Sequence, residues 1–327
     1  MFTYSRLLSL IAVLLAVLTA GYAAAQAYPA RPLRMIVPYP PGGSTDPTGR
    51  LFAAWFSEKL GQQVVVDNRP GAGATIGHGL AAKATPDGYT ILFATSGGLV
   101  TGPIFNANVP YDSLKDFSPI GLIAYNPFLL VTHPSLPAAD LKAFLDDAKA
   151  RPGKINFASP GVGTPNHLGI ELLTAMTGMK FVHVPYKGGG PAMLDMLAGR
   201  AQAIFSGVPQ CIVPVRAGRL KAIATGHPTR LSVASDAAPI ADTLPGFNNT
   251  TFFAFVAPAG TPRKIVERLS TETRKAIADP EFNKRLVDLG VVPVSSTPDG
   301  LHDMIRTEIK RWRKVINDAG ITAAAGS

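Results

Sequence analysis

Short apolar runs alternate with segments of helical periodicity along most of this chain. The apolar run at 33–39 is followed by a helical pattern at 47–60, whose large apolar residues share one face. The same alternation predicts further strands at 63–68, 89–96, 154–160, 181–188, 201–207 and 220–226. It predicts further helices at 73–84, 140–153, 165–177 and 191–198.

Two regions extend this alternation. The long apolar stretch at 117–133 predicts two more strands, and the tail from Pro262 predicts helices around one short strand at 291–296. Apolar strands that alternate with helices of about 10–15 residues indicate parallel sheets covered by helices on both faces. More than about ten strands are too many for one comfortable sheet. The pattern therefore predicts an α/β protein with two lobes.

The first 25 residues have the layout of a secretory signal peptide rather than of a folded core. Arg6 precedes an apolar run at 7–20, and small residues follow at 22–27. The run is shorter than the roughly 20 residues that a spanning helix needs, which disfavours the alternative of an uncleaved membrane anchor. We expect cleavage after Ala25, or else after Ala27, and a mature protein in the periplasm.

Composition and charge narrow the class of ligand. The chain has 327 residues, of which 46% are hydrophobic, and Cys211 is its only cysteine, so no intramolecular disulfide can form. The 31 basic residues exceed the 22 acidic ones, but they are scattered apart from a cluster at 308–314. Nucleic-acid binding would need a basic stripe with aromatic residues. A mild positive field suits small anionic ligands better.

Four predicted strands end in a Gly-rich turn that opens a helix. These turns lie at 40–46, 96–98, 160–165 and 188–191. Each turn leaves backbone N–H groups unpaired and places the positive end of a helix dipole at the carboxyl edge of a strand. Such a helix start binds anions readily. A plain structural turn remains the alternative for any one of them, but four together favour an anion site.

Nucleotide binding and catalysis find less support. The segment at 71–77 reads G-x-G-x-x-x-G, which is not the spacing of a dinucleotide fingerprint, and the first turn lacks the Lys of a phosphate-binding loop. Ser159 does not stand in a nucleophile elbow, and neither Ser159 nor Ser44 can be paired with a base from the sequence. The six His residues lack the spacing of a metal site. We expect no cofactor and no metal, with an exported hydrolase as the disfavoured alternative.

The serial order of the motifs resembles that of the Bug family, the TctC-type periplasmic substrate-binding proteins of tripartite tricarboxylate transporters. The resemblance covers essentially the whole mature chain and rests on VPYPPGGSTD, DNRPGAGATIG, PDGYTILFA, ASPGVGTPNHL, VPYKGGGPAMLDMLAG, VPVRAGRLKAIA, FVAPAGTP and LGVVPVSSTPDG. It implies a clamshell fold of the periplasmic-binding-protein type, in which each lobe is a mainly parallel sheet flanked by helices. It also implies a monomeric, non-enzymatic receptor for a small organic carboxylate. Such a receptor delivers its ligand to membrane transporter subunits; an exported sensor is the alternative.

The resemblance further implies where the ligand binds. Lobe I is expected to take 28–126 and 254–327, and lobe II 127–253. The candidate ligand residues of lobe I are Gly42, Gly43, Ser44, Asp46, Gly73, Ala74, Ser96 and Gly97. Those of lobe II are Ser159, Gly163, Thr164, His167, Tyr186, Gly188 and Ser206.

Two hydroxyls and one departure from the family pattern bear on this site. We expect the hydroxyls of Thr164 and Ser44 to hold one carboxylate from opposite sides of the cleft. Where the family commonly has an acidic residue, this chain reads GRAQAIFSG, so Gln202 and Ser206 stand in. A negative charge that would repel a second carboxylate is thereby absent. The sequence does not choose among organic carboxylates.

Overall fold

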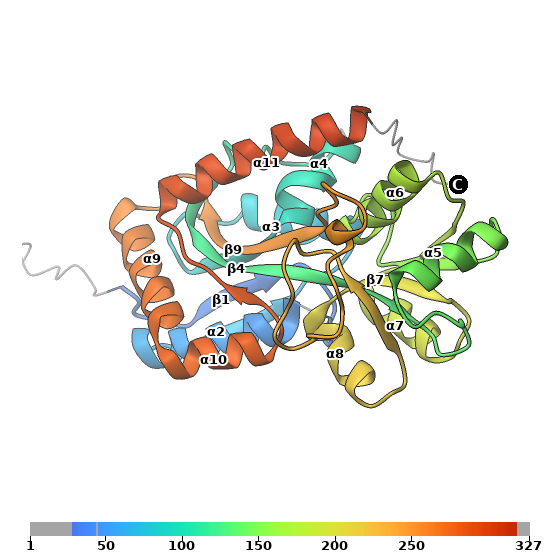
Figure 1. Cartoon of the computed structure of the whole chain (residues 1–327). Helices are drawn as coiled ribbons and strands as arrows, with labels where there is room; N and C mark the ends of the chain where they lie inside the picture. Colours follow the sequence, from blue (N-terminus) through green and yellow to red (C-terminus); the bar gives the residue numbers. More distant parts are fainter. Residues whose placement is uncertain (1–27, 44, 107, 319–327) are drawn as a thin grey trace, which may run out of the picture.

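One 10-stranded mixed sheet runs through both lobes of the protein, in the order β2-β1-β3-β9-β4-β7-β5-β6, with β8 and β10 also paired to β4. The long strands β4 and β9 lie side by side in Figure 1. The computed structural model describes residues 28–43, 45–106 and 108–318. The expected signal peptide and Ser44 therefore lie outside the described residues. Within the described part, no helix is both long and apolar enough to cross a membrane.

The first lobe is built on three parallel strands, which confirm the predicted alternation at the N-terminus. They are β1 (Leu33–Val37), β2 (Val64–Asn68) and β3 (Thr90–Thr95). The helices that follow them are α2 (Thr45–Leu60), α3 (Thr75–Ala82) and α4 (Gly102–Phe105), the last preceded by the π-helical turn η2 (Gly97–Thr101). The C-terminal part adds α9 (Arg263–Ala278), α10 (Pro280–Asp288), the short β10 (Val292–Pro293) and α11 (Pro298–Asp318).

The second lobe repeats the arrangement with a second set of strands. These are β5 (Asn156–Ser159), β6 (Val182–Pro185), β7 (Ala203–Gly207) and β8 (Lys221–Thr225). Its helices are α5 (Leu141–Ala150), α6 (Pro165–Thr177), α7 (Gly189–Leu197) and α8 (Val208–Arg216). The pattern did not predict α8, because Pro214 interrupts its helical periodicity.

Two long strands pass between the lobes. The stretch expected to form two strands is the single 16-residue strand β4 (Phe117–Thr132), so that prediction was wrong. It pairs antiparallel with β9 (Thr250–Pro258) as far as Pro127, and from Phe128 onward with β7. Pro127 has no N–H to donate and stands where the partner changes. The antiparallel ladders of β4 and β9 modify the mainly parallel sheet of each lobe.

Each lobe buries apolar side chains on both faces of its part of the sheet. In the first lobe Phe52 and Phe56 of α2 pack edge-on or tilted against Phe255 of β9, with ring centroids 5.1 and 5.3 Å apart. In the second lobe Phe157 of β5 stacks on Phe205 of β7 at 5.4 Å. These cores hold the strands in place, so the carboxyl ends of β1, β3, β5 and β6 and the turns after them keep a fixed geometry.

Candidate functional site

The Gly-rich turns of both lobes meet at one small cavity, here called the inner cavity. Its lining residues come from the first lobe, the second lobe and the two crossing strands. They are Tyr39, Pro40, Gly43, Thr45, Thr95, Ser96 and Gly97; Pro160, Pro165, Asn166, Gly189 and Gln210; and Asn126, Phe128, Thr251 and Phe253. Its free internal volume is about 40 Å³. Since one water needs about 10–15 Å³ by the same measure, the space suits a few water-sized groups or one carboxylate.

Three polar atoms at the inner cavity are buried without a hydrogen-bond partner among the described residues. They are Oγ1 of Thr45, Oγ of Ser96 and Oδ1 of Asn126. A buried polar atom left unpaired costs about 1–3 kcal/mol, so native proteins pair nearly all of them. The three atoms come from the start of α2, the end of β3 and the middle of β4. The structure thus presents two hydroxyl donors and one amide acceptor to whatever fills the cavity.

The orientation of Asn126 follows from its neighbour on the other crossing strand. The Thr251 hydroxyl donates to the backbone oxygen of Asn126 at 3.0 Å, so toward the Asn126 side chain it acts as an acceptor. Nδ2 of Asn126 donates to it at 3.2 Å. This places the amide nitrogen toward Thr251 and leaves Oδ1 as an acceptor for a water, or for a hydroxyl or amino group of a ligand.

Tyr39 stands between the inner cavity and a second, larger space, here called the outer chamber. Burial raises the pKa of Tyr39 to about 12, partly offset by the Thr95 hydroxyl, so the phenol is neutral at pH 7. The outer chamber has a volume of about 570 Å³ and shares Tyr39, Pro40 and Pro160 with the inner cavity. The other residues that line it are Pro70, Gly71, Ala72, Gly73, Ala74, Gly161, Val162, Tyr186, Lys187 and Gly188.

One wall of the outer chamber has an unusual backbone. Ala72, Gly73 and Ala74 have φ angles of 46°, 63° and 86°, so three successive residues are left-handed and two of them carry a side chain. Such conformations cost about 1–2 kcal/mol per residue and cluster at ligand clamps. The turn is held from outside: Thr75 Oγ1 donates to the Ala72 oxygen at 2.9 Å, and His78 Nδ1 hydrogen-bonds to the Ala74 oxygen at 2.9 Å.

The sequence-predicted residues fall into four groups. Gly43, Ser96 and Gly97 line the inner cavity, and Gly73, Ala74, Tyr186 and Gly188 line the outer chamber. Ser44 lies outside the described residues. The remaining candidates are at the turns but line neither space: Gly42, Asp46, Ser159, Gly163, Thr164, His167 and Ser206. Ser206 is fully buried, and its hydroxyl donates to the Gly207 oxygen at 3.4 Å.

Asp46 holds the first turn together. Its carboxylate accepts hydrogen bonds from Arg50 Nε at 3.0 Å, Asn68 Nδ2 at 3.1 Å and the Gly42 amide at 3.4 Å. Burial by itself would raise the pKa of Asp46, but the hydrogen bonds from Arg50 and Asn68 bring it below the ordinary value. At neutral pH the Asp46 carboxylate is therefore ionised and already engaged by these three hydrogen bonds, and it holds the turn in position.

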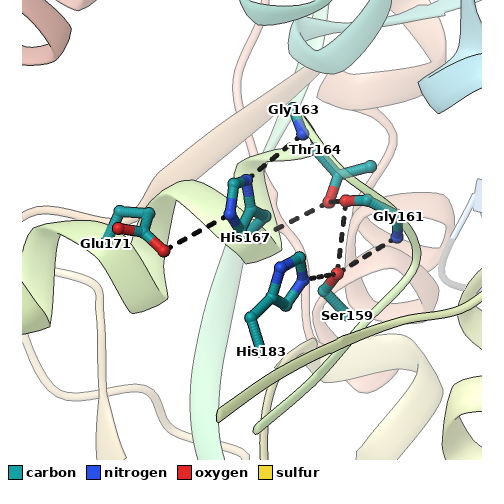
Figure 2. Close-up of polar contacts among 7 residues, drawn as sticks. All are labelled: Ser159, Gly161, Gly163, Thr164, His167, Glu171 and His183. Carbon is teal, nitrogen blue, oxygen red and sulfur yellow. Dashed lines mark hydrogen bonds and ion pairs between the residues drawn. The ribbon is translucent and has the colours of Figure 1, made fainter. Parts of the chain in front are cut away.

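Thr164 caps α6. Its hydroxyl donates to the Gly161 oxygen at 2.7 Å and accepts from the His167 amide at 3.4 Å (Figure 2). The hydroxyl proton that was expected to bind a carboxylate is thus engaged within the turn. His167 continues the same turn, because the Gly163 amide donates to its Nδ1 at 3.2 Å. The proton of the neutral ring then lies on Nε2, which faces Glu171 at 3.4 Å.

A second histidine, which sequence analysis did not select, meets the same turn. His183 of β6 stacks on His167 with ring centroids 4.1 Å apart, and its Nε2 lies 2.6 Å from Ser159 Oγ (Figure 2). Burial, and next the neighbouring His167, lower the pKa of His183 to about 4. A Ser–His pair was the feature that the hydrolase alternative lacked.

The Ser159–His183 pair is placed to support the turn. Ser159 is fully buried, accepts from the Gly161 amide at 3.1 Å and lines neither the inner cavity nor the outer chamber. The nearby carboxylate, Glu171, faces His167 rather than His183. A hydrogen bond from His167 lowers the pKa of Glu171. The four side chains therefore form a polar cluster that supports residues 160–164, in which Ser159 and His167 are buried and His183 and Glu171 are partly exposed.

Several cavity residues escaped sequence analysis although two of them carried a signal. Asn126 is a polar residue inside an otherwise apolar strand, and Thr45 stands directly after a selected serine. Asn166 and Gln210 gave no comparable signal, since they lie on helices whose facing direction depends on packing. Asn166 Nδ2 donates to the Phe205 oxygen at 2.7 Å, which joins α6 to β7 at the cavity edge.

A cavity between two α/β lobes joined by crossing strands defines the class of periplasmic-binding-protein-like receptors. Comparison with known proteins gives the family: residues 49–321 match the model of the tripartite tricarboxylate transporter family receptor, TctC. The chain belongs to this family, which confirms the resemblance found in its motifs. The family is a class of solute-binding receptors.

Individual relatives agree with this assignment over nearly their whole length. Protein BugT of Bordetella pertussis is 39% identical over 322 residues, which are 97% of this chain and 98% of that protein. The structure of the R. palustris protein Rpa4515 with adipate has a TM-score of 0.88 and 33% identity, covering 90% of this chain and 99% of that one. MatC of Rhodopseudomonas palustris, with bound malate, has a TM-score of 0.82 and 29% identity, covering 88% and 100%.

Two histidines with lowered pKa values, the buried His78 and the partly exposed His183, predict the direction of the pH dependence of stability. His183 and His78 titrate near pH 4 in the folded protein and near 6.5 when unfolded, so the unfolded chain binds more protons between these values. Their stabilisation is complete above about pH 6.5 and is lost as the pH falls through 4. We expect His183→Gln to flatten this part of the curve in urea unfolding. His302→Gln, on a partly exposed position of α11, serves as control; an equal flattening there would contradict the assignment.

The capping role of Thr164 makes a separate prediction. Thr164→Ala removes the acceptor for the His167 amide and should lower the free energy of unfolding by about 1 kcal/mol. Thr164→Ser keeps the hydroxyl and should stay close to wild type. Chemical denaturation of the three proteins measures both values. Unchanged stability of Thr164→Ala together with weakened carboxylate binding would instead make Thr164 a ligand contact.

Proposed function

We propose that this protein is an exported receptor that binds a small organic carboxylate between its lobes and delivers it to a membrane transporter of the tripartite tricarboxylate type. The observation that carries the proposal is the inner cavity, where the hydroxyls of Thr45 and Ser96 are buried at two adjoining turns and have no partner among the described residues. Family membership supports the receptor role. The adipate and malate named for two structural relatives support the carboxylate.

The proposed contacts combine hydroxyls with backbone amides. Ser96 and Thr45 donate to the carboxylate, and Gly43 and Gly97 let it approach the helix starts closely. Ser44 remains an expected contact of the same turn. Gly73, Ala74, Tyr186 and Gly188 surround the rest of the ligand. The predicted residues that line neither space hold the turns in position: Gly42, Asp46, Ser159, Gly163, Thr164, His167 and Ser206.

The cellular setting follows from the signal-like N-terminus and the family. We expect a cleaved signal peptide at 1–25, a monomeric mature protein in the periplasm, and no catalytic turnover of the ligand. An exported sensor that uses the same site without a transport role is the second candidate. Release of the ligand to membrane subunits would distinguish transport from sensing.

Ser96 provides the sharpest test of the binding site. A thermal-shift panel of mono-, di- and tricarboxylates with benzoate identifies a ligand, and calorimetry then gives its affinity. Ser96→Ala should weaken that affinity about ten- to a hundredfold, because a hydrogen bond to a charged group contributes about 1.5–3 kcal/mol. Ser232→Ala, at an exposed position, is the matched control.

Two results would contradict the proposal. If Ser96→Ala binds as tightly as wild type, the carboxylate is not held at the inner cavity. If the panel contains an acid that the purified protein converts, as followed by NMR of the incubated mixture, the receptor assignment gives way to an enzyme.

The lobe boundaries are a separate prediction. We expect lobe I to comprise 28–126 and 254–327, and lobe II 127–253; the change of partner along β4 between Pro127 and Phe128 supports this division. A ligand that contacts both lobes should favour closure about the crossing strands. Small-angle scattering should then give a slightly smaller radius of gyration at saturation. An identical curve with and without ligand would argue against hinge closure.

A further inference from the structure

We propose that the outer chamber binds the distal end of an elongated dicarboxylate and that Lys187 is the cationic contact for its second carboxylate. This inference rests on the proposed function, since it assumes that the first carboxylate occupies the inner cavity. It adds the class of ligand: a carboxylate at each end, joined by an apolar chain. Neither the family nor the motifs chose among carboxylates of different length and charge.

The sizes of the two spaces set the first constraint. The inner cavity, at about 40 Å³, has room for a single carboxylate, whereas the outer chamber has about 570 Å³. Tyr39, Pro40 and Pro160 line both, so the two spaces adjoin across these residues. The proposal therefore places the part of the ligand beyond its first carboxylate past Tyr39 and Pro160, in the outer chamber.

The walls of the outer chamber indicate the polarity of the middle part of the ligand. Pro70, Ala72 and Val162 present apolar surface there, and Val162 is 40% exposed. An exposed apolar side chain beside a cavity gains from burial against a hydrocarbon chain, by about 25 cal/mol for each Å² of apolar surface removed from water. The Tyr186 hydroxyl adds no free hydrogen-bond donor to this apolar wall, because it donates to Asp195 Oδ2 at 2.8 Å.

The charge of the outer chamber indicates which chemical group the distal end of the ligand carries. Among the described residues that line it, Lys187 alone carries a charged side chain, and it forms no ion pair with any described residue. The nearest acid along the chain, Asp195 of α7, is already paired with Arg200 at 2.6 Å and with Tyr186. A single exposed ammonium group at the edge of an otherwise uncharged chamber complements one distal carboxylate.

The experiment compares acids that differ only at the far end. Wild type is titrated by calorimetry at low ionic strength with the α,ω-dicarboxylates from malonate to suberate and with monocarboxylates of equal length, together with benzoate. We expect a dicarboxylate such as adipate to bind more tightly than hexanoate. Lys187→Met should weaken dicarboxylate binding about two- to fivefold, the range of an exposed ion pair, and leave the monocarboxylate unchanged. Lys149→Met, which removes the same charge from the exposed end of α5, should change neither.

Charge reversal at Lys187 gives a test whose expected result, opposite effects on two ligands, a loss of stability cannot produce. Lys187→Glu should weaken adipate further and strengthen 6-aminohexanoate, whose ammonium group would meet the new carboxylate. A variant that merely misfolds weakens both ligands together, and circular dichroism identifies it.

The outcomes separate this inference from the proposed function. Equal affinity of wild type for matched mono- and dicarboxylates, or an unchanged preference in Lys187→Met, overturns the role of Lys187 and leaves the carboxylate receptor intact. Binding of benzoate without any aliphatic acid overturns the elongated ligand and again leaves the receptor intact. Failure of every carboxylate to bind overturns both.

Discussion

The pairing of β4 with β9 is the constraint on which the rest of the structure depends. The two strands are neighbours as far as Pro127 and Thr250, and from Phe128 onward β4 pairs with β7 instead. Asn126 and Thr251 join them by two hydrogen bonds at this point and also line the inner cavity. Because separating the strands would break this ladder of hydrogen bonds, we expect any closure of the lobes to bend the strands rather than part them.

The turns that form those walls are held by their own side chains rather than by a ligand. Asp46 fixes the first turn, Thr164 and Ser159 the third, and His78 joins the left-handed turn of the outer chamber to the end of β3. An added Cβ at Gly98 would lie 2.1 Å from Cε1 of His78, which shows how closely this residue is packed. Turns ordered in advance spare a ligand the conformational entropy of ordering them. The polar atoms of Thr45, Ser96 and Asn126 that have no partner among residues 28–43, 45–106 and 108–318 are then the ones proposed to contact the ligand.

Much of the secondary structure was predictable because its signals are local. The helix expected at 165–177 is α6 without change of bounds, since Thr164 and Pro165 begin it and Gly178, in the left-handed region, ends it. The single strand β4 was predicted as two, because pairing with β9 on one side and with β7 on the other is not visible in the sequence around Pro127. Helix α8 was missed because Pro214 breaks its helical sequence pattern. The folded protein nevertheless accommodates this proline near the end of the helix.

The sequence by itself determined the α/β alternation, the Gly-rich helix starts and, through their serial order, the family. It could not decide which hydroxyl at a helix start faces a ligand. Thr164 and Thr45 both stand at such a start, yet the first is engaged by Gly161, and the second, at the inner cavity, has no partner in the part of the chain that the structure describes. The pairing of Ser159 with His183, 24 positions apart, and of Asn126 with Thr251, 125 apart, also arose only in the folded chain. The physical reason is that the direction of a side chain is set by the elements packed against it, and those elements come from distant parts of the sequence.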